Sequence, residues 1–122
     1  MIRGIRGATT VERDTEMEVI SAVEKLMGEI IQVNEIDPDM VASVFFSATE
    51  EIRSVFPAKA LRKFEGWTYV PVTCMKEIPV SNSLPFCIRV MIHLNTTKSQ
   101  KEIQHVYQAG ATVLRPDLTK QI

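Results

Sequence analysis

The chain has 122 residues, of which 45% are hydrophobic, and its formal net charge at pH 7 is −1. This length suits a single domain spanning residues 1–122, and the near-neutral charge argues against nucleic acid as a partner. No apolar run is long enough to span a bilayer, so we expect no membrane association. Without a signal peptide, and with two cysteines outside any metal or redox spacing, the chain is expected to be cytoplasmic with free thiols.

Apolar periodicity and breaker residues predict alternating strands and helices. In the first half they predict a strand over 1–7, a polar connection over 8–13, a helix over 14–34, a helical turn at 37–38, a strand over 41–48, a short helical connection over 49–55 and a helix over 56–64. In the second half they predict an extended segment over 69–73, a bend over 74–77, a loop over 78–85, a strand over 86–94, a helix over 99–108, a last strand over 111–114 and a flexible tail over 116–122. Thr15 with Glu18 and Ser99 with Glu102 are spaced as capping boxes, and Pro71 suggests an edge strand.

This order predicts an α/β (α+β) domain with a mixed five-stranded sheet and helices on one face. The predicted strands are apolar on both faces, and the helices can cover only one of them. A homo-oligomer whose sheets pack together would cover the other.

Arginines stand within three apolar, strand-like segments, as Arg6, Arg89 and Arg115. Arginine is always charged and offers a planar fork of donors that matches carboxylates, and burying it without a partner is expensive. Two interpretations of Arg89 remain open: a structural ion pair with an Asp or Glu, or an anion-binding site. Because Arg3 and Arg6 lie three residues apart, they should point to opposite faces, and only one of them should join a given site.

The other candidates are weaker. Glu77 lies in the predicted bend, and Cys74 is more typical of a packing residue than of a nucleophile because no histidine is next to it. His105 and Glu102 would share a helical face, but two ligands alone do not make a metal site. Tyr107 carries a phenol that can donate to a carboxylate. With no phosphate loop or nucleophile motif, this inventory suits anion binding and electrostatic stabilisation without metal or cofactor.

A set of segments, taken together, carries a family resemblance. They are Ile2–Thr10, Ser47–Thr49, Val55–Ala60, Tyr69–Met75 with Glu77, Cys87–Met91, His105–Tyr107 and Val113–Leu118. With these segments the chain resembles the small monofunctional chorismate mutases of the trimeric pseudo-α/β-barrel class. The resemblance implies a homotrimer with active sites at subunit interfaces. It also implies the rearrangement of chorismate to prephenate in the biosynthesis of Phe and Tyr.

The resemblance also implies site residues, with Arg89 and Glu77 as the catalytic pair. By matching position, Arg6, Tyr107 and Arg89 would hold the side-chain carboxylate and ether region of the substrate. Glu77 and the Thr73–Cys74 segment would meet the ring hydroxyl. The remaining residues expected to contact substrate or line the pocket are Phe56, Lys59, Arg62, Met75, Lys76, Leu114 and Arg115.

The implied reaction fits the residue inventory. It is pericyclic and requires no nucleophile, proton transfer, metal or cofactor. Negative charge grows on the ether oxygen as the C–O bond stretches, and a fixed guanidinium there would favour the transition state over the ground state. Two alternatives stay open: a trimeric imine or enamine deaminase of similar fold, and a non-enzymatic carboxylate-binding module.

Overall fold

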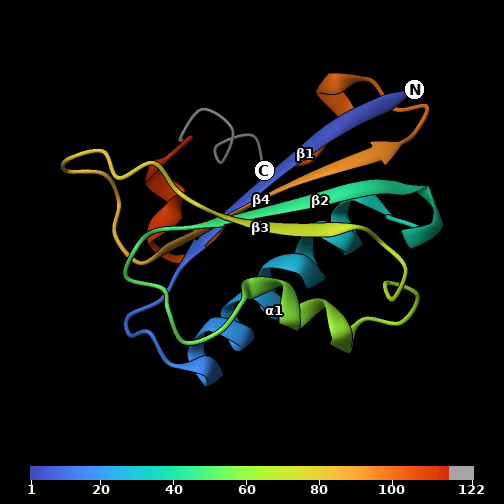
Figure 1. The fold of residues 1–122 in the computed structure, drawn as a ribbon. Helices are drawn as coiled ribbons and strands as arrows, with labels where there is room; N and C mark the ends of the chain where they lie inside the picture. Colours follow the sequence, from blue (N-terminus) through green and yellow to red (C-terminus); the bar gives the residue numbers. More distant parts are fainter. Residues whose placement is uncertain (116–122) are drawn as a thin grey trace.

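The structure, a computed structural model that describes residues 1–115, is built on one five-stranded sheet with the order β3-β2-β4-β1-β5 (Figure 1). The strands are β1 (Ile2–Thr10), β2 (Val41–Ala48), β3 (Val72–Lys76), β4 (Cys87–Asn95) and β5 (Val106–Tyr107). β4 pairs antiparallel with β1 and β2, whereas β3 pairs parallel with β2 and β5 parallel with β1. The predicted mixed five-stranded sheet is therefore confirmed, and the predicted tail over 116–122 lies outside the described residues.

In the described residues, one long helix and four short 3₁₀ helices accompany the sheet. They are α1 (Glu16–Asn34), η1 (Pro38–Met40), η2 (Pro57–Lys63), η3 (Gln100–Glu102) and η4 (Ala109–Val113). The predicted N-cap of α1 is confirmed, since the backbone N–H of Glu18 donates to the Thr15 hydroxyl at 3.2 Å. Within residues 1–115, no helix combines the length and the apolar character needed to cross a membrane.

The core lies between α1 with η2 and one face of the sheet (Figure 1). The apolar side chains that α1 buries recur every three or four residues, so they form one stripe along the helix. The fully buried members of this stripe are Val19, Val23, Leu26, Met27 and Ile30. β4 buries Ile88 and Ile92 against the same core. We call this side of the sheet the covered face.

Within the described part of the chain, no long helix lies over the opposite side, which we call the open face. Alternation along β4 puts Arg89, Met91 and His93 there, and none of the three is buried. Among residues 1–115, η4 covers a corner of this face, where Ala8, Cys87 and Ala111 form a small buried cluster. The prediction of helices on one face and an uncovered second face is thus confirmed for most of the sheet.

Two predicted connections differ from the structure. β1 continues to Thr10, so residues 8–10 are not a polar connection, because their backbone pairs with β4 as far as Cys87. Residues 49–55 form no helix. Apart from a local turn in which the Ile52 N–H donates to the Thr49 carbonyl, the backbone here is held by a distant partner, with the N–H groups of Arg53 and Ser54 donating to the Asp14 carboxylate at 2.9 and 3.1 Å.

The prediction around Pro71 is wrong in its boundaries but right about the edge. The strand begins at Val72, and the predicted bend at 74–77 is instead paired strand up to Lys76, which stands opposite Ala48 of β2. The backbone N–H of Glu77 extends the pairing to the Ala48 carbonyl at 2.9 Å. Pairing with β2 therefore outweighed the local bend signal, and β3 does lie at an edge of the sheet.

The last third of the chain departs most from prediction. The helix expected over 99–108 is only the single turn η3, although its predicted capping box is present. The buried amide of Asn34 binds both the backbone N–H and the carbonyl of Gln104, each at 2.8 Å, which holds the chain extended as it enters β5. The prediction of a strand over 111–114 is wrong too, because residues 111–113 belong to η4 and Leu114 caps it.

Candidate active site

Arg89 lies on the open face beside small neighbours. In the strand register it stands opposite Ala8 of β1 and Ser47 of β2. These short side chains leave room over the sheet, and a hollow of about 350 Å³ lies there. The described residues that line it and that the sequence predicted for the site are Arg6, Met75, Glu77, Arg89, Tyr107, Leu114 and Arg115. We call this the Arg89 hollow.

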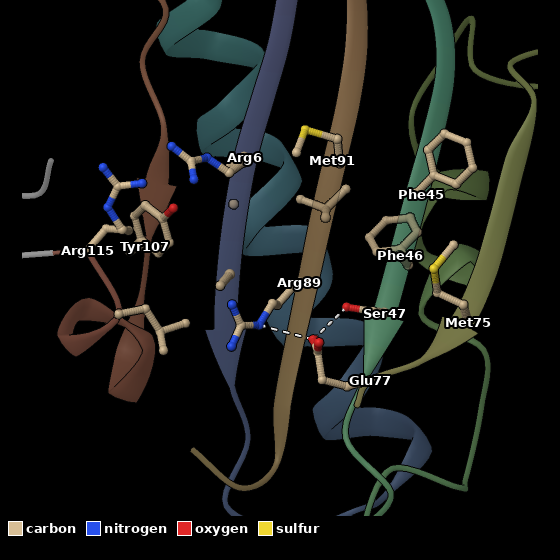
Figure 2. Close-up of a pocket in the computed structure, with 14 residues that line it drawn as sticks. Arg6, Phe45, Phe46, Ser47, Met75, Glu77, Arg89, Met91, Tyr107 and Arg115 are labelled. Atoms are coloured by element: carbon tan, nitrogen blue, oxygen red, sulfur yellow. Dashed lines mark hydrogen bonds and ion pairs between the residues drawn. The ribbon is translucent and has the colours of Figure 1, made fainter. Parts of the chain in front are cut away.

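Glu77 is the ion-pair partner of Arg89. Its Oε2 atom lies 3.1 Å from Arg89 Nε, and the Ser47 hydroxyl donates to the same oxygen at 2.9 Å (Figure 2). The side chains of Arg89 and Glu77 are 45% and 26% exposed. Arg89 thus forms an ion pair with a carboxylate of its own chain, as the structural interpretation predicted, but this pair is not buried. Partly exposed pairs of this kind are weak, so the pair leaves Arg89 available to a ligand.

The N–H donors of the Arg89 guanidinium point in two directions, Nε toward Glu77 and the terminal amino groups away from it (Figure 2). Arginine has five N–H donors, four of them on these terminal groups. The arrangement therefore presents donors to the hollow and not only to Glu77.

Arg6, Tyr107 and Arg115 stand on the far side of the Arg89 hollow (Figure 2). Arg6 comes from β1 and Tyr107 from β5, and these strands are neighbours in the sheet. Of the residues that the structure describes, three arginines and one glutamate line the hollow, so its electrostatic character suits a ligand with more than one negative charge.

His105 supports Arg6 and is not a metal ligand with Glu102. Its Nδ1 atom accepts a hydrogen bond from the backbone N–H of Arg6 at 2.9 Å. Burial above all, and then the positive charges of Arg6 and Arg115, lower the pKa of His105 below its ordinary value. The imidazole is therefore neutral at pH 7 and places no further charge beside the hollow. Glu102 instead closes the capping box with Ser99, and no group of three or more His, Cys, Asp or Glu within residues 1–115 could hold a metal ion.

Most of the other predicted site residues line a second, larger hollow beside β3, whereas Thr73 lines neither hollow. The volume of this second hollow is about 800 Å³, and we call it the Phe56 hollow. The predicted residues that line it are Phe56, Lys59, Arg62, Cys74, Met75 and Lys76. Phe56 is 75% exposed, which is unusual for so large an apolar side chain. Only Met75 among the predicted residues lines both hollows, so the structure divides the predicted site into two groups.

Thr73 and Cys74 point in opposite directions from β3. Thr73 is exposed and stands opposite Phe45, while Cys74 is half-buried against the main core. The other thiol, Cys87, is fully buried, and burial raises its pKa. A raised pKa disfavours the nucleophilic thiolate at Cys87.

The Ser47 hydroxyl is a polar contact of Glu77 that residue patterns did not single out. Alternation along residues 41–48 could have placed it on the same face as Phe45. Its partner could not be found that way, because Glu77 lies 30 positions later in the chain.

Comparison with known proteins agrees with this geometry. The sequence model of the chorismate mutase type I family matches residues 2–118. The chorismate mutase AroH of Bacillus subtilis is 52% identical over 119 residues, covering 98% of this chain and 94% of the relative. The chorismate mutase AroH of Thermus thermophilus is 43% identical over 119 residues, covering 97% of each chain.

A solved structure is also similar. A chorismate mutase from Clostridium thermocellum superimposes with a TM-score of 0.87 at 44% identity, covering 91% of this chain and 98% of the other. These matches agree with the resemblance carried by the motifs and leave no role for the deaminase or binding-module alternatives. The chain therefore belongs to the chorismate mutase type I family and catalyses the isomerisation of chorismate to prephenate.

Proposed function

We propose that the isomerisation takes place in composite sites of a homotrimer, each made by the Arg89 hollow of one subunit and the Phe56 hollow of the next. The observation that carries this proposal is the division of the predicted site residues between two hollows. β3 and β5 are the two edges of the sheet, four strand spacings apart, which amounts to roughly 19 Å. A single small dianion cannot reach from Tyr107 on β5 to Phe56 beyond β3 within one chain.

Association of copies would bring the two hollows together. The open face carries exposed or half-buried apolar side chains such as Phe45, Met75 and Met91, which favours contact with another sheet. Packing different surfaces of identical chains against each other produces a ring when the rotation closes. A ring of three follows from the family resemblance, and light scattering of the purified protein measures it directly.

Arg89 has the central role in this proposal. As the C–O bond of chorismate stretches, negative charge develops on the ether oxygen, and the terminal amino groups of Arg89 would meet it there. A donor that gains strength only as the charge appears lowers the barrier more than it lowers the ground state. Glu77 would complement the positive character that develops on the ring.

Arg6, Tyr107 and Arg115 would hold a substrate carboxylate. A carboxylate keeps its charge throughout the rearrangement, so these contacts would bind the ground state and the transition state about equally. Their loss should therefore appear mainly in KM, whereas loss of Arg89 should appear mainly in kcat.

Complementation between subunits tests the composite site. Arg89→Ala disables the Arg89 hollow and Arg62→Ala the Phe56 hollow, and each variant alone should have low activity in the chorismate absorbance assay. Co-expression should restore activity, because an interface between the two intact hollows forms in every mixed trimer. Random mixing of three subunits makes about one quarter of the sites intact. If the mixed protein is no more active than the separate variants, each site lies within one chain and the proposal is wrong.

A further inference from the structure

We propose that Ser47 is a positioning residue that keeps Glu77 from capturing the terminal amino groups of Arg89. The inference rests on the roles proposed for Arg89 and Glu77. Ser47 lies next to last in β2, opposite Arg89 of β4 on one side and Met75 of β3 on the other. It therefore lies in the row of side chains between Arg89 and the end of β3, where Glu77 follows.

Two neighbouring residues of β2 hold Glu77. The backbone N–H of Glu77 donates to the Ala48 carbonyl at 2.9 Å, and its Oε2 atom accepts from the Ser47 hydroxyl at 2.9 Å. The same oxygen lies 3.1 Å from Arg89 Nε (Figure 2). One carboxylate oxygen of Glu77 is thus held by both Ser47 and Arg89, and the Ser47 contact restrains the carboxylate from turning toward Arg89.

The alternative arrangement explains why this matters. Arginine and carboxylate groups often form a two-pronged pair in which both carboxylate oxygens take N–H donors of the guanidinium. The terminal torsion of glutamate is broad, so without the Ser47 hydroxyl the carboxylate of Glu77 would be able to turn toward Arg89 and close such a pair. That pair would engage a terminal amino group that otherwise faces the hollow. Ser47 also lines the Arg89 hollow, but its hydroxyl is engaged by Glu77, so in this inference it affects the reaction through Glu77 and Arg89.

Ser43 provides a matched control on the same strand and the same face. Its hydroxyl lies 3.0 Å from Nδ1 of His93, so it forms a side-chain hydrogen bond of the same kind at another place. Substituting either serine by alanine removes one hydroxyl from a half-buried position of β2. Only Ser47→Ala removes a contact of Glu77.

Steady-state kinetics tests the inference. We expect Ser47→Ala to lower kcat about tenfold, the effect of losing one hydrogen bond to a charged group. KM, the melting temperature and the oligomeric state should stay close to those of the parent protein. Ser47→Thr keeps the hydroxyl and should retain most of the activity, while Ser43→Ala should leave kcat unchanged. An undiminished kcat in Ser47→Ala would overturn the inference, and so would an equal loss in Ser43→Ala.

A double substitution separates positioning from a general structural effect. In a Glu77→Ala background, Ser47→Ala should cause no further loss of kcat, because the residue through which it acts is gone. A further tenfold loss there would show that Ser47 acts by another route. Arg89→Ala, assayed beside these variants, keeps the proposals apart. If Arg89→Ala is fully active, the proposed function fails. If it is inactive while Ser47→Ala is normal, only the present inference fails.

Discussion

The two faces of β4 carry residues of very different character. On the covered face, Ile88 and Ile92 are fully buried beneath α1. On the open face, the same strand presents Arg89, 45% exposed and paired only loosely with Glu77. One side of the strand is therefore covered by its own chain, whereas in our proposal the other side is covered by substrate and by a second subunit. Substitutions on the covered face should change stability, and substitutions on the open face should change turnover or substrate affinity.

Arg89→Ala should have the largest effect on the open face. Removing one oxyanion donor costs about 10² to 10³ in rate, and we expect kcat to fall at least that far with a melting temperature near that of the parent. Arg89→Lys should also be poor, because a point charge on a flexible stem cannot reproduce a planar fork. Chorismate absorbance measures the rate and circular dichroism the melting. Near-normal turnover in Arg89→Lys would contradict the electrostatic role.

Arg6→Ala should affect substrate affinity more than turnover. Hydrogen bonds to charged groups contribute about 1.5–3 kcal/mol, so KM should rise about 10- to 100-fold while kcat changes little. Arg3→Ala is the control, because Arg3 lies on the other face of β1 and its Nε donates to the Lys98 carbonyl at 3.0 Å. If Arg6→Ala and Arg3→Ala raise KM equally, the two faces of β1 do not differ in their role and the prediction is wrong.

Gly7→Ala should destabilise the covered face without a direct effect on the site. An added Cβ would lie 2.6 Å from Ile30 Cδ1 and 3.2 Å from the Val106 carbonyl oxygen, so the fully buried Ile30 side chain and the β5 backbone would have to shift. Overpacking of this kind costs about 1–3 kcal/mol, which thermal unfolding can measure. Gly4→Ala, on the open face of the same strand, meets only the flexible Met91 side chain at 3.3 Å and should be nearly neutral. Equal melting temperatures for the two variants would refute this contrast.

The smallest predicted effect concerns Asp14, which fixes the segment leading to Phe56. A hydrogen bond from the Ser54 side chain lowers the pKa of Asp14 most, opposed in part by burial and assisted by the backbone N–H groups of Arg53 and Ser54. Because the pKa of Asp14 is lowered in the folded state, its ionised carboxylate stabilises the fold at any pH above the ordinary pKa of 3.8. This stabilisation is lost as the pH falls through the pKa of the folded state.

Asp14→Ala should therefore melt a few degrees below the parent at pH 7, and the difference should shrink as the pH is lowered below 3.8. Melting curves across this pH range provide the measurement. A difference that stays constant down to pH 2 would mean that the carboxylate charge is not the cause.

Local signals predicted the elements whose boundaries depend on local interactions. The strand over Val41–Ala48 and the helix capped by Thr15 agree with the structure because alternation and capping are encoded within a few residues. The capping box at Ser99 is equally real, yet the helix stops after one turn. Its length is set by Asn34, which lies 70 positions away from Gln104 in the chain. The sequence around Ser99 therefore cannot predict that contact.

For the candidate site, too, local sequence patterns predicted only part of what the structure shows. Arg89 could be singled out because a charge within an apolar strand is rare, and the family resemblance supplied most of the other residues. The division of those residues between the two hollows could not be predicted, because it depends on where β3 begins. The contact of Ser47 with Glu77 depends on the register of β2 with β3. These features are determined by pairing between distant segments and not by local pattern.

The central claim is that the positive charge of Arg89 stabilises charge that develops only during the reaction. Its most direct test is replacement of Arg89 by citrulline through semisynthesis, since citrulline keeps nearly the shape of arginine but is neutral. The account predicts that kcat falls by at least about 10², while the fold, the oligomeric state and substrate binding remain close to those of the parent protein. A citrulline variant that turns over chorismate at the parent rate would contradict it.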